Sequence, residues 1–308
     1  MYDLIIIGAG PAGLAASIYA SRYKINHLVI GKEVGGAALK AHKVENYPGF
    51  ESVAGFELMQ KFQRHAQSLG AEIKMEEATG LRKTSEGFEV IVRQEEKYSS
   101  RSVILALGTE LKKTGVPGEE RLIGRGVSYC ATCDAPFFRQ KTVAVVGGSN
   151  AAATSAIMLA DFADRVYLIF RKDSLEADPV WIKKMEGNPK IKMIARASLG
   201  EIKGEDKVES VILKSENEEA KELQANGVFV AIGSIPSVSL AKGLGVETDE
   251  RGYIKIGPDS STNVAGVYAA GDATNGSVGW RQIVTAVAEG ALASHSAYDY
   301  LQKNPAKR

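Results

Sequence analysis

Residues 3–13 read Asp-Leu-Ile-Ile-Ile-Gly-Ala-Gly-Pro-Ala-Gly, a run of apolar residues that leads into a glycine-rich turn. The apolar run at residues 4–7 predicts a buried parallel strand. Pro11 at the head of an alanine-rich segment predicts a helix that continues to about residue 23, and residues 26–30 predict the next strand. Strand, glycine turn, helix and strand in this order form a βαβ unit, the local motif of an α/β fold.

The three glycines of this turn have the spacing of a dinucleotide-binding fingerprint. Gly8 makes the tight turn, Gly10 lets a pyrophosphate approach the backbone, and Gly13 packs the helix against the strand. Glu33 lies 20 residues beyond Gly13, where a carboxylate binds the ribose hydroxyls. Because the fingerprint follows a predicted strand and opens a predicted helix, we expect it to bind a dinucleotide rather than to serve as a turn alone.

A second copy of the motif occurs near the middle of the chain. Residues 142–152 read Thr-Val-Ala-Val-Val-Gly-Gly-Ser-Asn-Ala-Ala, which predicts a strand at 142–146 and a helix at 150–162. Apolar residues 166–170 predict the following strand. In this copy Ser149 takes the place of the middle glycine, and its side chain crowds the position where a pyrophosphate approaches the backbone.

Basic side chains follow the second strand of this copy. Lys172, beside Arg171, lies 20 residues beyond Ala152, the position at which the first copy has its acid. Cations there favour a 2′-phosphate, and therefore NADPH over NADH. Glu176 lies one turn further on and weakens this preference. The second copy is interpreted as a nucleotide site that favours NADPH, and the alternative is a degenerate copy that binds no nucleotide.

The two copies indicate an α/β protein with two Rossmann-like dinucleotide-binding domains built of ββα layers. Residues 112–126 are rich in glycine, proline and charge and predict a linker into the second domain, and residues 234–238 predict the return. The segment 266–272 and a predicted helix at 281–301 have no glycine turn of their own, so we expect them to complete the first domain. The second domain is thus predicted to be inserted into the first. The predicted domain segments are residues 1–112, 113–236 and 237–308.

The remaining strands are short. Residues 72–101 are turn-rich with alternating polarity and predict a small antiparallel meander, which a buried strand at 103–109 follows. In the second domain, further strands are predicted at residues 191–195, 207–213 and 228–232.

The chain contains two cysteines, Cys130 and Cys133, in a Cys-x-x-Cys arrangement ahead of the second glycine turn. A zinc half-site would need two further ligands, but there are no other cysteines and the four histidines show no paired spacing. Inert buried thiols rarely have this spacing. A redox dithiol explains both the short loop that a disulfide would close and the neighbouring carboxylate of Asp134, which can give and accept a proton. We therefore predict that this pair is catalytic.

The composition limits the partners of the chain. Its 308 residues are 44% hydrophobic and 24% charged, with a formal net charge of +1, which gives no reason to expect nucleic acid or an anionic membrane as a partner. No stretch approaches the roughly 18 apolar residues of a membrane-spanning helix. The N-terminus leads directly into a strand without a basic signal segment, and two cysteines make no framework of structural disulfides. The sequence therefore predicts a cytoplasmic protein.

Taken in order, these motifs resemble the low-molecular-weight thioredoxin reductases, which are class II FAD-dependent pyridine nucleotide-disulfide oxidoreductases. The resemblance covers nearly the whole chain, and its most specific strings are Cys-Ala-Thr-Cys-Asp at residues 130–134 and Ala-Ala-Gly-Asp-Ala at residues 269–273. The other shared motifs are residues 8–13, 35–36, 44–49, 229–233 and 266–272.

The resemblance implies a thioredoxin-disulfide reductase with FAD in the first domain and NADPH in the inserted domain, which carries the dithiol. Cys133 would accept electrons from reduced FAD, Cys130 would attack the disulfide of a thioredoxin-like protein, and Asp134 would move protons. It also implies a homodimer in which the inserted domain rotates on hinges near residues 112–115 and 234–238. The FAD-binding residues would be Gly8, Gly10, Pro11, Ala12, Gly13, Glu33, Gly36, Asn46, Gly108, Gly271, Asp272, Arg281 and Gln282. The pyridine-nucleotide residues would be Gly147, Gly148, Ser149, Asn150, Arg171 and Lys172.

The second nucleotide site departs from the family pattern. A His-Arg-Arg motif with a further arginine four residues on becomes Phe170-Arg171-Lys172 with Glu176, and in the first domain Ala37 replaces the glutamine that follows the paired glycines. Relatives with an eroded second site take electrons from ferredoxin or run as dithiol oxidases, so a ferredoxin-dependent flavin thioredoxin reductase and an FAD-dependent dithiol oxidase are the alternatives. A nucleotide-binding module whose dithiol only senses redox state is the non-enzymatic alternative, and the carboxylate beside the dithiol argues against it.

Overall fold

The chain folds into two compact units in a computed structural model. The structure describes residues 1–93, 95–215 and 220–305. The split unit comprises Met1–Glu110 together with Ile235–Arg308, and the inserted unit is Leu111–Ser234. Each boundary between the units falls two residues before the domain junction predicted from the sequence.

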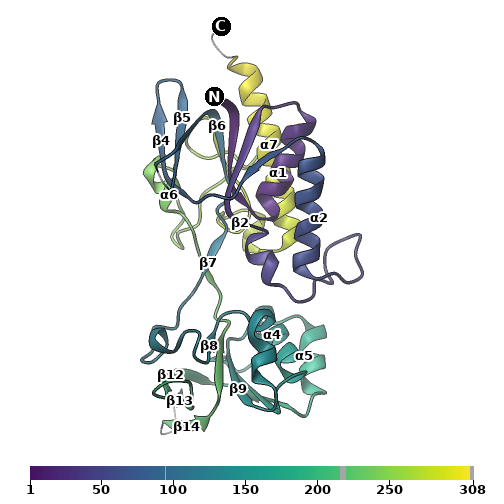
Figure 1. Cartoon of the computed structure of the whole chain (residues 1–308), viewed down its shortest axis with the longest axis vertical. Helices are drawn as coiled ribbons and strands as arrows, with labels where there is room; N and C mark the ends of the chain where they lie inside the picture. Colours follow the sequence, from purple (N-terminus) through teal and green to yellow (C-terminus); the bar gives the residue numbers. More distant parts are fainter. Residues whose placement is uncertain (94, 216–219, 306–308) are drawn as a thin grey trace. The chain divides into compact units, whose positions relative to one another are not determined.

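The split unit is built on one mixed sheet (Figure 1). Its strands are β1 (Tyr2–Ala9), β2 (His27–Val34), β3 (Glu72–Lys74), β4 (Ala78–Thr84), β5 (Gly87–Val92), β6 (Lys97–Leu105) and β17 (Val267–Ala269). Its helices are α1 (Pro11–Arg22), α2 (Gly55–Ser68), α6 (Ser239–Gly243) and α7 (Ile283–Lys303), with the 3-10 turns η1 (Gly36–Lys40) and η4 (Ser277–Gly279). The sheet has the order β3-β2-β1-β6-β5-β4, and β17 pairs with β6. Strands β3, β2, β1, β6 and β17 are parallel, whereas β4, β5 and β6 form an antiparallel meander.

Alternate residues of β1 face two different layers, as the period of a strand requires. Leu4 and Ile6 are fully buried and pack with alanines of α1 and α7. Ile5 and Ile7 point to the opposite side and pack with residues of the meander such as Phe88. Figure 1 shows α1, α2 and α7 together on one side of this sheet. Because both faces of β1 are covered, its sequence is a continuous apolar run.

The inserted unit repeats this plan with a parallel sheet and a small antiparallel sheet. Its strands are β8 (Val127–Ser128), β9 (Thr142–Val146), β10 (Arg165–Ile169), β11 (Ile191–Ile194), β12 (Ala197–Lys203), β13 (Ser210–Ser215), β14 (Lys221–Gln224) and β15 (Gly227–Val230). Its helices are α3 (Ala131–Asp134), α4 (Asn150–Ala160) and α5 (Pro179–Glu186), with the 3-10 turns η2 (Glu120–Leu122) and η3 (Ala135–Phe138). The parallel sheet has the order β11-β10-β9-β15-β8, and β12-β13-β14 form the antiparallel sheet.

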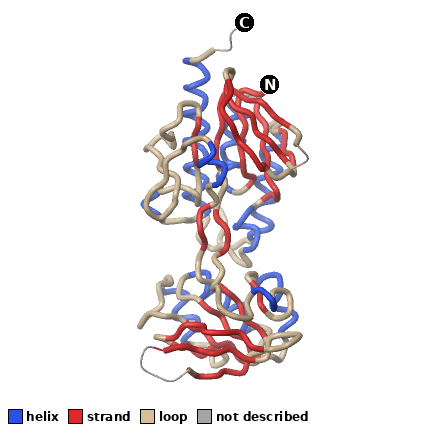
Figure 2. The backbone as a smooth tube through the Cα atoms, turned by 90° about the vertical axis from the view of Figure 1, so that its left-hand side faces the viewer, coloured by secondary structure: helices blue, strands red, loops and turns tan. Residues whose placement is uncertain are grey.

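Strand β9 again divides its side chains between two layers. Val143 and Val145 pack with α4, whereas Ala144 and Val146 pack with the sheet of β12 and β13, for example with Val211. Each unit therefore has the predicted ββα layers, and the predicted α/β fold with Rossmann-like parallel sheets is confirmed. Figure 2 shows the strands of each unit in red, with the helices in blue behind or beside them.

Two predicted segments differ from the structure. The meander was expected to begin at residue 72, but β3 pairs in parallel with β2 and extends the main sheet, so this part of the prediction is wrong. Strand β6 runs through Lys97–Leu105 without a break, although its first half was assigned to the meander and its second half to a separate buried strand. This single long strand belongs both to the meander and to the parallel part of the sheet, because it pairs with β5 as well as with β1.

The chain passes between the units through two short segments. They are β7 (Thr109–Leu111) and β16 (Ser234–Pro236), which pair with each other as a two-stranded ribbon. The N–H of Lys112 donates to the carbonyl of Gly233 over 3.0 Å, and that of Ser237 donates to the carbonyl of Gly108 over 3.1 Å.

Among the residues that the structure describes, no helix has both the length and the apolar character needed to cross a bilayer.

Candidate active site

The first glycine of each turn lies against a carbonyl group of a neighbouring strand end. Gly8 has a φ of +116° and Gly147 a φ of +146°. A Cβ on Gly8 would lie 2.0 Å from the carbonyl oxygen of Ala106, and one on Gly147 would lie 2.1 Å from that of Ala231. The two copies of the motif are thus built alike at this position, and neither accepts a side chain.

Gly10, where α1 begins, has different surroundings. Its φ of −79° is open to any residue, and the nearest atom to a Cβ built on it would be the Gly35 carbonyl oxygen at 4.0 Å. Gly36, in the turn η1, lies across from it. No acidic residue stands in the first turn of α1, and no side chain caps it. The positive end of the helix therefore opens onto free space, which fits the pyrophosphate of a dinucleotide.

Asn46 and Gln282, which are 236 positions apart, are brought together. The Nδ2 of Asn46 donates to Oε1 of Gln282 over 3.0 Å. Asn46 lies in a loop closed by a bridge between Val44 and Val53. Gln282 is the N-cap of α7, and its N–H donates to the hydroxyl oxygen of Thr285 over 3.0 Å. Two residues that the family resemblance assigns separately to FAD thus lie side by side at the start of one helix.

Glu289 organises the loop that carries Gly271 and Asp272, and the sequence analysis did not single it out. Its carboxylate, on the buried face of α7, accepts hydrogen bonds from the Gly271 N–H at 2.8 Å, the Thr274 hydroxyl at 2.9 Å and the Ser277 hydroxyl at 2.6 Å. The only signal for Glu289 in the sequence was its position as an acidic residue in an otherwise apolar stretch of a predicted helix. Glu289 therefore ties α7 to the loop in which Asp272 lies.

Asp272 and Arg281 are both partly buried and interact in the same loop region. Burial raises the pKa of the Asp272 carboxyl, the Arg281 guanidinium lowers it and Glu289 raises it again, so that the pKa lies above its ordinary value. The Nε of Arg281 donates to the main-chain carbonyl of Asp272 over 3.3 Å, and its guanidinium lies 3.7 Å from the ring centroid of Tyr253. These contacts fix Arg281 beside the loop that is predicted to hold FAD.

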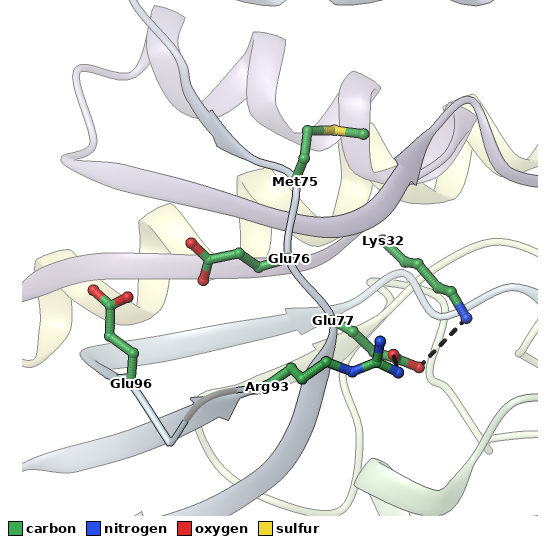
Figure 3. Close-up of a pocket in the computed structure, with 6 residues that line it drawn as sticks. All are labelled: Lys32, Met75, Glu76, Glu77, Arg93 and Glu96. Carbon is green, nitrogen blue, oxygen red and sulfur yellow. Dashed lines mark ion pairs between the residues drawn. The ribbon is translucent and has the colours of Figure 1, made fainter.

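A surface hollow of about 370 Å³ opens beside the end of β2 (Figure 3). Glu77 pairs there with Lys32 at 3.7 Å and with Arg93 at 2.6 Å. The residues that line the hollow are Lys32, Met75, Glu76, Glu77, Arg93 and Glu96. None is a predicted site residue, but Lys32 directly precedes Glu33, whose side chain is exposed on β2. The hollow thus begins one residue from the predicted ribose contact.

The two cysteines form a disulfide at the start of the short helix α3. Their Cα atoms are 5.3 Å apart, and the predicted pairing is therefore present. Cys130 is the N-cap of α3, and the N–H of Cys133 donates to its Sγ over 3.2 Å. The N–H of Asp134 donates to the carbonyl of Cys130 over 3.2 Å. Cys133 is exposed and Cys130 is half-buried. A donor aimed at the Cys130 sulfur favours its thiolate, the reactive form, once the disulfide is reduced.

In the second glycine turn, a following segment pairs with the predicted nucleotide residues. The N–H of Glu176 donates to the carbonyl of Gly148 over 2.7 Å, and the N–H of Asp178 donates to Oδ1 of Asn150 over 2.6 Å. Lys172 forms an ion pair with Glu176, at side chains that are both exposed. Glu176, which was predicted to weaken the preference for NADPH, therefore does so in part by pairing with one of the two cations predicted to bind the 2′-phosphate.

The chain matches known proteins over almost all of its length. A family model described as pyridine nucleotide-disulphide oxidoreductase matches residues 2–290. A thioredoxin reductase of Treponema pallidum is 43% identical over 303 residues, which cover 97% of this chain and 97% of the relative. The crystal structure of Lactococcus lactis thioredoxin reductase in the FR conformation has a TM-score of 0.95 and 34% identity, and the match covers 98% of this chain and 100% of that chain.

A further solved relative is a ferredoxin-flavin thioredoxin reductase from Clostridium acetobutylicum, with 34% identity, a TM-score of 0.53 and a match over 98% of this chain and 99% of that chain. Fold, dithiol and glycine turns together define a pyridine nucleotide-disulphide oxidoreductase. Within that class, the chain belongs to the low-molecular-weight thioredoxin reductase family.

Proposed function

We propose that the chain is a thioredoxin-disulfide reductase in which the Cys130–Cys133 disulfide receives electrons from FAD and passes them to the disulfide of a thioredoxin-like protein. The observation that carries the proposal is the disulfide at the start of α3, with Asp134 in the same turn. Support comes from relatives named thioredoxin reductase that match nearly the whole chain.

Residues of the split unit fit both the adenosine half and the flavin half of FAD. The free space in front of Gly10 and the uncapped start of α1 suit the pyrophosphate, and Glu33, which is exposed on β2, would bind the ribose hydroxyls. The pair of Asn46 and Gln282 and the loop of Asp272 would hold the flavin half. FAD, when bound, supplies the electron pair that converts the disulfide into a dithiol.

Replacing Gly10 by valine is expected to give a folded protein with little FAD. A Cβ at this position meets no protein atom closer than 4.0 Å, so the branched side chain fills the space that a pyrophosphate needs rather than straining the fold. The measurement is the ratio of flavin absorbance to protein, with the melting temperature as a check on folding. Ser149→Val, the same change in the second turn, is the control and should keep its FAD. A fully flavinylated Gly10→Val protein would contradict the assignment.

The dithiol then reduces its target in two exchanges that balance in bonds and protons. The Cys130 thiolate attacks one sulfur of the target disulfide, a mixed disulfide forms, and the other target sulfur leaves as a thiolate that takes up a proton. Cys133 attacks the Cys130 sulfur, the internal disulfide re-forms, and the second target thiolate leaves and is protonated. Asp134, in the same turn, would deliver protons to these leaving groups.

NADPH is the electron donor that we propose, through the second glycine turn. Arg171 and Lys172 follow β10, where the spacing of the motif predicts a contact to a 2′-phosphate. Each charge-assisted hydrogen bond to that phosphate would be worth roughly 1.5–3 kcal/mol. Against this, Ser149 crowds the pyrophosphate position and Glu176 pairs with Lys172. We infer that the two cations outweigh these losses by a narrow margin.

NADPH is expected to reduce the flavin faster than NADH does, and Arg171→Ala should lower this preference by about tenfold or more, the value of one charged hydrogen bond. Glu176→Gln should raise the preference because it releases Lys172. Arg165→Ala, at the exposed opposite end of β10, is the matched control. The rates come from rapid anaerobic mixing at equal nucleotide concentrations.

A ferredoxin-dependent reductase is the second candidate, favoured by the pairing of the 176–178 segment with Gly148 and Asn150 and by the ferredoxin-linked relative. Anaerobic reduction with NADPH, NADH and reduced ferredoxin in parallel, followed by a thioredoxin assay, separates the candidates. Loss of the flavin absorbance with reduced ferredoxin, but with neither nucleotide, would identify ferredoxin and not NADPH as the donor. Bleaching only by a small dithiol, with reoxidation by oxygen, would favour the dithiol oxidase.

The family resemblance also leads us to propose a homodimer in the cytoplasm. Sedimentation at equilibrium tests the first part, and fractionation of cells that express the full chain tests the second. A monomer at micromolar concentration would remove the dimer from the proposal.

A further inference from the structure

Glu119 is a buried carboxylate of the inserted unit for which the steps above have no use. Only 1% of its surface is exposed. Its Oε1 accepts hydrogen bonds from the Thr114 N–H at 2.9 Å and the Tyr129 hydroxyl at 2.7 Å. Its Oε2 accepts from the Thr114 hydroxyl at 2.8 Å and the Gly115 N–H at 2.7 Å. Both oxygens thus have two donors each, which uses the acceptor capacity of a carboxylate in full.

These donors come from two segments that are separate in the sequence. Thr114 and Gly115 lie just after β7, where the chain enters the inserted unit. Tyr129 directly precedes Cys130. The turn that carries Glu119 is itself held to β12, because the Ile202 N–H donates to the carbonyl of Pro117 over 2.9 Å. The Glu119 side chain therefore links the entering segment to the residue before the dithiol, and the turn that carries Glu119 is bound to β12.

The protonation states suit this linkage. Burial raises the pKa of Glu119, but the donors from Thr114, Tyr129 and Gly115 outweigh burial, so that its pKa lies below the ordinary value. Burial together with the hydrogen bond to Glu119 raises the pKa of the Tyr129 hydroxyl. The carboxylate therefore stays charged and the phenol keeps its proton, which gives a charge-assisted hydrogen bond.

Cys130 depends on its neighbours for its position. Its N–H donates to the hydroxyl of Ser128 over 3.0 Å, and its Sγ accepts from the N–H of Cys133 over 3.2 Å. With Tyr129 held by Glu119, the peptide before Cys130 has few ways to move. A dithiol whose two sulfurs are held together closes to a disulfide more readily than one whose sulfurs are free to separate.

We propose that Glu119 is a positioning residue for the dithiol: through Tyr129 it holds the peptide that carries Cys130 against the entering segment, and so stabilises the Cys130–Cys133 disulfide. The proposal rests on the redox role proposed above for this pair. Tyr129 and Glu119 act as one unit in this respect, since each is the other's hydrogen-bond partner.

The test is the midpoint potential of the dithiol in the full FAD-loaded protein, equilibrated in dithiothreitol redox buffers and read by labelling of free thiols. Tyr129→Phe and Glu119→Gln should each make the disulfide about tenfold easier to reduce, which is about 30 mV less negative. The double variant should shift no further than the larger single shift, because the two residues serve one contact. Glu120→Gln is the matched control, since Glu120 is exposed and pairs with Lys113.

The outcome does not depend on Glu119→Gln folding. Tyr129→Phe leaves three of the four hydrogen bonds of the carboxylate in place and keeps the ring, so it decides the matter alone if the other variant does not fold. An unchanged potential in Tyr129→Phe, additive shifts in the double variant, or an equal shift in Glu120→Gln would overturn the proposal. Neither donor nor thioredoxin enters the measurement, so a failure of the proposed function, seen as no thioredoxin reduction by the unaltered protein, is a separate result.

Discussion

Replacing Cys130 by serine is expected to abolish the reduction of a thioredoxin disulfide, with a loss on the order of 10³-fold or more because the attacking thiolate is gone. Replacing Cys133 should abolish turnover equally but leave Cys130 able to attack. The two variants therefore differ in what they trap. With a thioredoxin activated as a mixed disulfide with thionitrobenzoate, reduced Cys133→Ser should release the yellow thiolate and form a covalent adduct, whereas Cys130→Ser should not.

The double variant Cys130→Ser/Cys133→Ser is the control for both cysteine replacements, because it should keep FAD and form no adduct. Flavin absorbance of all three variants tests whether the split unit is intact. Full turnover of either single variant with a thioredoxin substrate would defeat the dithiol relay. An adduct through Cys133 instead of Cys130 would reverse their roles, in agreement with the greater exposure of Cys133.

Asp134→Asn is expected to lower turnover by roughly 10²–10⁴-fold, which is the usual contribution of a positioned proton donor. Asparagine keeps the size of the side chain, and the N–H of residue 134 can still donate to the carbonyl of Cys130. FAD content and the disulfide should be unchanged. The measurement is the steady-state rate with thioredoxin at saturating donor.

Glu120→Gln, which removes an exposed acid from the same unit, is the control for Asp134→Asn and should leave the rate unchanged. A loss below about threefold in Asp134→Asn would mean that water or another group moves the proton. A loss of FAD would mean that the substitution disturbs the fold and not the proton transfer.

The parallel strands could be predicted because each is a local apolar run next to a glycine turn. The strand predicted at 142–146 is β9, and the first helix starts at Pro11 as predicted. The three-residue strand β3 could not be predicted in this way. Its sequence, Glu72-Ile73-Lys74, has no apolar run, and its parallel pairing depends on the position of β2 in the folded sheet.

The contacts within the candidate site were harder to predict from the sequence than the residues that form it. Family motifs pointed to Asn46 and Gln282 separately, but only the fold brings their side chains together. Glu119 gave no signal, and Glu289 gave only that of an acid in an apolar stretch, because a buried glutamate is stable only where the fold supplies donors, and those donors come from other segments. The pairing of Lys172 with Glu176 was missed because the sequence shows their charges but not the path of the loop between them.

The first and the second position of each glycine turn are constrained by different parts of the system. Gly8 and Gly147 are required by the packing of their own units, because a side chain at either position would clash with a neighbouring carbonyl group. Gly10 and Ser149 are constrained instead by the ligand that would bind at the start of the helix. A glycine at the first position is therefore required by the fold whether or not a nucleotide binds, and it gives no evidence that the site is occupied. Only the second position bears on the ligand, so the electron donor has to be tested at the second copy and cannot be inferred from its first glycine.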